Sequence, residues 1–409
     1  MRITIDDIRS AAAALAGQVI RTPSIESRVL SELCGTDIVL KLENLQVTGS
    51  FKARGAYIKL ISLSDQERKA GVVAASAGNH AQGVAYHAKR LGIPATIYMP
   101  AATPFTKVAR TEALGAWVVL EGETLAEARQ SAMKRVVDDG MIFVHPYDDE
   151  LVVTGQGTVG LEFLTDVPDL EAMIVPIGGG GILAGSAISA KAIKSDLDII
   201  GVEAAAFPSM SQALRGAKPG GGGATIADGI AVKEPGEVTR PIINELVSDI
   251  LIVDESAMER AVQAYLEQQR LVVEGAGAAG LAAVMENPER FRGKKTGIVV
   301  TGGNIDSRIL SSILMRGLVR EGRLVRFRIH IDDAPGVLSK VSGLIGICGG
   351  NIIEVYHQRL FRDVPIRQAE VDVVIETLDV DHVREIMEAL TTAGFGVRLL
   401  GDTSLDTDR

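Results

Sequence analysis

The sequence predicts an α/β fold with mainly parallel sheets, followed by a smaller unit with the ferredoxin-like order of strands and helices. Between residues 37 and 319, short apolar runs alternate with segments of helical spacing, as in crossover units that join parallel strands. After residue 320 the pattern changes: apolar and charged residues alternate over 325–331, which is typical of a half-exposed antiparallel strand. With 409 residues, 46% of them apolar, the chain is long enough for two or three domains with large cores.

The first part contains the parallel sheets. Asp6 and Asp7 lie in the first turn of a helix predicted over 4–16, where carboxylates favour the positive end of the helix dipole. Further strands are predicted at 37–42, 72–76, 95–99, 117–120, 173–177, 199–203 and 298–301, and further helices at 55–63, 79–91, 107–114, 124–138, 255–271 and 309–319. Parallel sheets bind ligands beyond the carboxyl ends of their strands, so we expect functional residues in the turns that follow them.

The second part has the order βαββαβ. Strands are predicted at 325–331, 351–359, 367–375 and 396–400, and helices at 335–347 and 382–393. The change of pattern falls in the charged stretch Arg320–Arg323. We therefore predict a first domain over 1–319, a linker over 320–324, a second domain over 325–401 and a polar tail over 402–409.

Composition excludes several classes of partner. A net charge of −10 and a pI of about 5.3 disfavour nucleic acid and anionic membrane surfaces. Residues 172–190 carry no charge, but Pro176 and four glycines interrupt them, which favours a buried strand, loop and helix over a membrane span.

Cys34 and Cys348 lack metal-ligand spacing, and the N-terminus lacks the apolar region of a signal peptide. A cytoplasmic protein with reduced thiols is expected.

A run of four glycines, Gly178, Gly179, Gly180 and Gly181, separates a predicted strand from a run of helical spacing. Bare backbone before a helix can turn several N–H groups toward one anion, and the helix adds its positive end. A flexible linker is the alternative. A second glycine run, at 220–223, has no strand before it and is expected to be a loop or a lid. The first run is therefore the predicted phosphate site.

Three further turns follow predicted strands. Lys52 lies between the strand at 37–42 and the next helix, although an isolated lysine is more often solvated. The turn from Ser76 to His80 precedes a helix, so Ser76 or Asn79 could simply be an N-cap. Thr301 ends the strand at 298–301, where a strand-end turn is the alternative interpretation.

Together these pieces are far more specific than any one of them. The segments Ser50–Ala56, Ser76–Gly83, Gly178–Ile182 and Thr301–Asp306 resemble those of the fold-type II pyridoxal-phosphate enzymes, and among these the threonine/serine dehydratases. The C-terminal unit, with Asp333-Ala-Pro-Gly336 at its first helix, resembles an ACT regulatory domain. The resemblance covers residues 5 to 400.

The resemblance implies pyridoxal 5′-phosphate as cofactor and assigns roles to residues. Lys52 would be the Schiff-base lysine and then the base that removes the Cα proton. Asn79 would bond the 3′-oxygen of the cofactor ring, and Thr301 would contact its pyridine nitrogen. The cofactor phosphate would be bound by Gly178, Gly179, Gly180, Gly181 and Ile182. The substrate carboxylate would be bound by Ser76, Ala77, Gly78, Asn79 and His80. Phe51 would pack against the cofactor or in the core.

Three positions refine the comparison. Serine racemases of this fold carry a second serine where this chain has Ala77, which argues against racemisation. Related racemases hold a divalent metal through a glutamate that matches Glu203, but residues 204–210 supply no carboxylate. The remaining interpretations of Glu203 are a ligand of a monovalent cation and a cap of a turn. Glu274 would line the active site, or would stabilise the first turn of the helix after it.

The resemblance therefore implies deamination of L-threonine to 2-oxobutanoate, with L-serine giving pyruvate, in a homodimer or homotetramer. Asp333, Pro335, Gly336 and Asn351 are the candidate effector residues, with isoleucine as inhibitor; a pure dimerisation module is the alternative. A serine or 3-hydroxyaspartate dehydratase, a catabolic threonine dehydratase and an amino-acid-sensing protein with a vestigial catalytic domain stay open. One methyl group in a pocket changes specificity by only about 1–3 kcal/mol.

Overall fold

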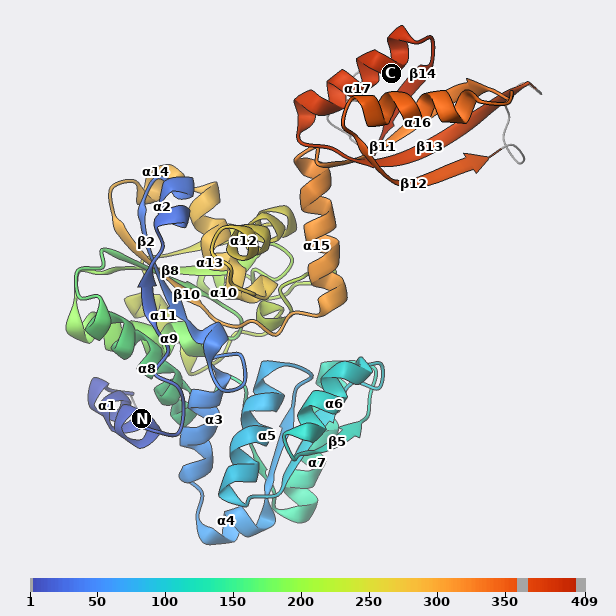
Figure 1. Cartoon of the computed structure of the whole chain (residues 1–409). Helices are drawn as coiled ribbons and strands as arrows, with labels where there is room; N and C mark the ends of the chain where they lie inside the picture. Colours follow the sequence, from blue (N-terminus) through green and yellow to red (C-terminus); the bar gives the residue numbers. More distant parts are fainter. Residues whose placement is uncertain (1–2, 359–366, 402–409) are drawn as a thin grey trace. The chain divides into compact units, whose positions relative to one another are not determined.

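The computed structural model describes residues 3–358 and 367–401 and contains two compact units, Met1–Asp306 and Ser307–Arg409 (Figure 1). The predicted change of domain at 319/320 differs from this division. The helix α15 (Ser307–Arg320) groups with the second unit, whose first strand follows it. Within the described residues, no helix is long and apolar enough to cross a membrane.

The first unit contains two sheets, and the predicted mainly parallel arrangement is confirmed. The larger has the order β1-β2-β10-β7-β8-β9, in which β1 alone pairs antiparallel. The smaller has the order β5-β4-β3-β6 and is parallel throughout. The strands are β1 (Ser24–Glu26), β2 (Asp37–Leu42), β3 (Val72–Ala75), β4 (Ala95–Met99), β5 (Trp117–Leu120), β6 (Ile142–Phe143), β7 (Ala172–Pro176), β8 (Asp198–Ala204), β9 (Asp249–Val253) and β10 (Lys295–Val300).

Most predicted helices of the first unit form, with two informative differences. The helix at 255–271 ends at Glu267, because Arg270 takes a left-handed backbone with φ of +59°. The helix at 55–63 begins earlier, at Lys52. The helices are α1 (Ile5–Leu15), α2 (Arg28–Cys34), α3 (Lys52–Ile61), α4 (Asp65–Ala70), α5 (Asn79–Leu91), α6 (Phe105–Ala113), α7 (Leu125–Asp139), α8 (Glu150–Asp166), α9 (Gly181–Ile193), α10 (Ser209–Leu214), α11 (Thr239–Leu246), α12 (Glu255–Glu267), α13 (Gly275–Glu286) and α14 (Pro288–Phe291), with short 3₁₀ turns at Glu43–Leu45 and Asp228–Ile230.

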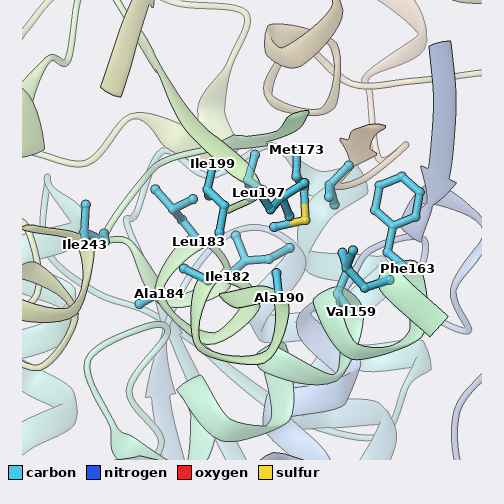
Figure 2. Close-up of a cluster of buried hydrophobic side chains, with 14 of the residues drawn as sticks. Val159, Phe163, Met173, Ile182, Leu183, Ala184, Ala190, Leu197, Ile199 and Ile243 are labelled. Atoms are coloured by element: carbon cyan, nitrogen blue, oxygen red, sulfur yellow. The ribbon is translucent and has the colours of Figure 1, made fainter. Parts of the chain in front are cut away.

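One core cluster lies between the six-stranded sheet and the helices α8 and α9. Figure 2 shows Phe163 of α8 and Leu183 of α9 in this cluster with Met173 of β7 and Ile199 of β8. The backbones of α8 and α9 approach closely, since a Cβ on Gly185 would lie 2.4 Å from the Val153 carbonyl oxygen. This packing holds α9 against the sheet, and the glycine run connects the end of β7 to the start of α9.

The second unit has the predicted ferredoxin-like order. Its antiparallel sheet has the order β12-β13-β11-β14, and Phe327 and Ile329 of β11 pack with Val341 and Ile345 of α16. The elements are β11 (Leu324–Asp332), α16 (Val337–Ile347), β12 (Asn351–Gln358), β13 (Gln368–Glu376), α17 (Val380–Thr392) and β14 (Gly396–Leu400). The predicted strand end at 359 and the predicted tail at 402–409 lie outside the described residues.

Candidate active site

The glycine run forms an uncapped helix start at the carboxyl end of β7. Gly180 is the N-cap residue of α9, with φ of +94°, and no side chain makes a cap hydrogen bond. Among residues 3–358 and 367–401, the N–H groups of 178–182 have no hydrogen-bond partner. A Cβ on Gly179 would lie 2.1 Å from Cδ2 of Tyr147. Free N–H groups at the positive end of a helix form an anion site.

The second glycine run, at 220–223, lies in a stretch without helix or strand, so it is a loop. A Cβ on Gly220 would meet nothing within 4 Å, unlike one on the crowded Gly179. In the structure, as in the sequence, only the first of these two glycine runs lies between a strand and a helix.

Lys52 is the first residue of α3 and carries a buried amine. Its Nζ donates to the Pro146 carbonyl oxygen at 2.7 Å and lies 5.1 Å from the centroid of the Phe51 ring. Burial lowers the pKa of Lys52 to about 8, against the opposing effect of the Glu274 carboxylate. A solvated surface lysine is thus excluded, and the amine is poised to act as a nucleophile or base.

Thr301 lies beside this lysine turn. It follows β10 directly and is 3% exposed. Its carbonyl accepts a hydrogen bond from the Phe51 N–H at 3.3 Å, and Ser50 forms an isolated β-bridge with Gly302. The structure therefore joins the turn after β10 to the residues that precede Lys52.

Asn79 is joined to the same place through its side chain. Its Nδ2 donates to Oε1 of Glu274 at 2.8 Å, and its Oδ1 accepts from Nδ2 of Asn304 at 2.5 Å. Glu274 is the N-cap residue of α13 but makes no side-chain cap bond. Burial raises the pKa of Glu274 to about 7, although the Asn79 hydrogen bond lowers it. The Glu274 carboxylate thus bonds Asn79 rather than capping its own helix.

The turn before α5 is also an uncapped helix start. Gly78 is its N-cap residue and makes no side-chain cap bond, so neither Ser76 nor Asn79 is the N-cap considered above. Ser76 Oγ accepts from the Gly78 N–H at 3.2 Å, and Ala77 is half-buried. The His80 Nε2 lies 2.8 Å from the Val144 carbonyl oxygen. Burial, aided by the positive Lys52, lowers the pKa of His80 to about 3, so its imidazole is neutral.

Glu203 binds protein groups with both carboxylate oxygens. It accepts from the Met210 N–H at 2.7 Å, and from the Ser211 N–H and hydroxyl at 2.9 and 2.7 Å. Burial raises the pKa of Glu203 despite these bonds. No group of three potential metal ligands occurs among the residues that the structure describes. The geometry supports the capping role, here at the start of α10.

The candidate effector residues are split between the two ends of β13. Asp333 donates its N–H to the Arg367 carbonyl, and Pro335 and Gly336 lie in the same turn before α16. Asn351 bonds Glu376 at the other end, so about 26 Å of strand separates the two groups at ~3.3 Å per residue. A cavity of about 810 Å³ adjoins the first end and is lined in part by Asp332, Lys340, Gln368 and Phe395. One unit alone therefore does not bring these residues together.

Three residues near the site had not been predicted. Tyr147 packs against the glycine run and donates its hydroxyl to the Glu234 carbonyl at 2.9 Å. Pro146 supplies the acceptor for Lys52, and Asn304 holds Asn79. A signal for Pro146 and Tyr147 was present, since they follow the short strand β6 at its carboxyl end.

The chain belongs to the pyridoxal-phosphate dependent enzymes, because the family described as "Pyridoxal-phosphate dependent enzyme" matches residues 15–302. The cofactor is therefore pyridoxal 5′-phosphate. The described residues fit it: the free N–H groups at the start of α9 suit its phosphate, the Lys52 amine its aldehyde, and the Asn79 amide its ring oxygen.

Within this family, the chain is similar to enzymes named for threonine. It is 45% identical over 401 residues to an L-threonine ammonia-lyase of Thermotoga maritima, covering 98% of this chain and 100% of that one. It is 41% identical over 322 residues to an L-threonine dehydratase, catabolic TdcB, of Staphylococcus aureus, covering 77% of this chain and 93% of the relative. The structure of maize serine racemase aligns with a TM-score of 0.72 at 33% identity, covering 78% of this chain and 99% of that one. The fold alone thus does not choose the reaction.

Proposed function

We propose that this chain converts L-threonine to 2-oxobutanoate and ammonia, and L-serine to pyruvate and ammonia. The observation that carries the proposal is Lys52, a buried amine of lowered pKa beside Thr301 and near two uncapped helix starts. Similarity to an L-threonine ammonia-lyase over nearly the whole chain supports threonine as the preferred substrate.

The residues at the site divide the work. When bound, pyridoxal phosphate withdraws electron density from the substrate Cα, so that its proton becomes acidic. Lys52 takes that proton, because its lowered pKa leaves part of the amine unprotonated near neutral pH. The N–H groups at the start of α5 bind the substrate carboxylate, and those at the start of α9 hold the cofactor phosphate.

Two positions favour elimination over racemisation. Thr301 offers a neutral hydroxyl to the ring nitrogen of the cofactor. A hydroxyl holds a protonated ring nitrogen less firmly than a carboxylate does, so the cofactor ring withdraws electrons less strongly. The charge formed at Cα is then best relieved by prompt loss of the β-hydroxyl. Ala77 carries no group that could donate a proton to the opposite face of Cα. Both positions support a lyase.

The second unit supports regulation by an amino acid. We assign residues 325–401 to an ACT regulatory domain, on the ferredoxin-like order of β11 to β14. The Thermotoga maritima relative is matched over 98% of this chain, whereas the catabolic relative is matched over 77%. This difference favours a biosynthetic enzyme that feeds isoleucine formation and is inhibited by isoleucine. Because the effector residues lie at opposite ends of β13, the site would need two copies of the unit, in a homodimer or homotetramer.

The test is release of 2-oxo acid from threonine and serine, each with and without isoleucine. We expect a higher kcat/KM for threonine and inhibition by isoleucine. K52A should abolish turnover. K59A should retain it, because Lys59 is another lysine of α3 that pairs with Asp149. Equal rates for both substrates without an isoleucine effect would contradict the biosynthetic role. A protein that stays colourless with added cofactor would instead favour an amino-acid-binding function.

A further inference from the structure

Two hydrogen bonds link the side chains of Asn304, Asn79 and Glu274 at the site. Asn79 Nδ2 donates to Oε1 of Glu274 at 2.8 Å, and Asn304 Nδ2 donates to Oδ1 of Asn79 at 2.5 Å. These bonds therefore join α5, the start of α13 and the turn after β10.

The number of hydrogens available fixes the orientation of both amides. Asn304 Nδ2 gives its second hydrogen to the Thr48 carbonyl at 2.9 Å, so both of its donors are used. Asn79 Nδ2 gives one hydrogen to Glu274, and its second N–H has no partner within residues 3–358 and 367–401. Reversing the Asn79 amide would set its NH₂ group against that of Asn304 and its oxygen against the Glu274 carboxylate. The amide is thus held from both sides, with one donor to spare.

Bare backbone makes room for these three side chains. A Cβ on Gly302 would lie 2.3 Å from Oε1 of Glu274 and 3.2 Å from Nδ2 of Asn79. A Cβ on Gly49, whose φ is +72°, would lie 2.8 Å from Oδ1 of Asn304. Glycine at both positions lets the three polar groups meet without displacement.

We propose that Asn304 and Glu274 are positioning residues that hold the Asn79 amide so that its spare N–H, rather than its carbonyl, meets the ring oxygen of pyridoxal phosphate. The inference rests on the cofactor role proposed for Asn79, and not on the choice of threonine as substrate. The ring oxygen carries negative charge, so a donor is attracted to it, whereas the amide oxygen of a reversed Asn79 would be repelled.

The test is a double-mutant cycle on cofactor binding. N304D replaces the donor with a carboxylate that repels Oδ1 of Asn79, so the amide should turn over. We expect the dissociation constant of pyridoxal phosphate to rise about tenfold or more, the size of one charge-assisted hydrogen bond. The absorption maximum of the bound cofactor should move in the same direction as in N79A. In the N79A background, N304D should have no further effect on either quantity, because Asn304 acts through Asn79.

N287D is the matched control. Asn287 also donates its Nδ2 to a backbone carbonyl, that of Ala283 at 2.9 Å, but at the far end of α13. It should keep the wild-type affinity and spectrum. The inference is overturned if N304D keeps both as well, or if the effects of N79A and N304D multiply in the double variant. Since both readouts concern cofactor binding, a protein that binds the cofactor but does not turn over threonine would refute only the proposed substrate.

Discussion

Arg54, two residues after Lys52, holds a buried charge cluster of the first unit. Its side chain is fully buried and makes four hydrogen bonds of 2.7 to 2.9 Å to the carboxylates of Glu43 and Glu162. Lys41, also fully buried, donates to Glu162 at 2.7 Å. Arg54 and Lys41 therefore balance Glu43 and Glu162 where α3 begins, and Lys41 also lies 4.0 Å from Asp166, the partner of Arg21.

The substitution R54M leaves two carboxylates facing the single ammonium of Lys41. Removing one partner of a buried ion pair typically destabilises a protein by about 3–5 kcal/mol, because the other charge stays buried without compensation. At roughly 2 °C per kcal/mol for a unit of this size, the Tm should fall by about 6–10 °C. Thermal melts near neutral pH, followed by far-UV circular dichroism, measure this shift.

R260M is the matched control, since Arg260 pairs with Glu286 away from this cluster while its side chain is 39% exposed. An exposed pair contributes about 0–1 kcal/mol, so its Tm should fall by no more than roughly 2 °C. If R54M melts within that same range, the charge balance is not what stabilises the unit.

The acid dependence gives a second check on the same cluster. Burial raises the pKa of Glu43, but Arg54, Lys41 and Thr22 outweigh it and hold the pKa below its ordinary value of 4.5. Stability from this carboxylate is therefore present above its unfolded pKa and is lost as the pH falls through the folded one. Without Arg54 the pKa should lie above the ordinary value, so the gap between R54M and wild type should narrow as the pH approaches about 4.5.

Gly179, Lys52 and Glu274 each give one further expected result. G179A should weaken pyridoxal phosphate binding about tenfold or more in a titration, because its Cβ meets the Tyr147 ring, whereas G220A, in open space, should not. The rate at which the apoenzyme takes up the cofactor should rise with pH, half-maximal near 8 and not near 10.5, since the neutral Lys52 amine reacts. Burial raises the pKa of Glu274 to about 7, so the wild type loses stability as the pH rises from about 4.5 to 7 and does not regain it above pH 7. The Tm advantage of E274Q over wild type should therefore be larger at pH 8 than at pH 5.

The turns that carry the site were predictable because each follows a strand of a parallel sheet. Lys52, Asn79 and Thr301 were all placed by that rule, and the structure brings Thr301 beside Lys52 through the Phe51 N–H. The helix α8 was not predicted, because its glycines lower helix propensity. In the structure they permit close packing: a Cβ on Gly155 would lie 2.7 Å from Cα of Gly55. That requirement belongs to the packed chain and has no local signal.

The partner of Glu274 could not be predicted for a related reason. The sequence left a choice between an active-site role and stabilisation of the helix that follows. The carboxylate bonds Asn79, which is 195 residues away, and only the packing of α5 near the start of α13 brings the two together. The effector residues show the same limit, since their separation along β13 depends on the register of the sheet.

The proposed function requires that the Lys52 amine bonds the cofactor aldehyde. Borohydride reduction of the purified protein with pyridoxal phosphate, followed by digestion and mass spectrometry, tests this directly. We predict a cofactor adduct on the peptide that contains Lys52, and its loss in K52A while K59A keeps it. An adduct on another lysine in the wild-type protein, or none at all, would contradict the account.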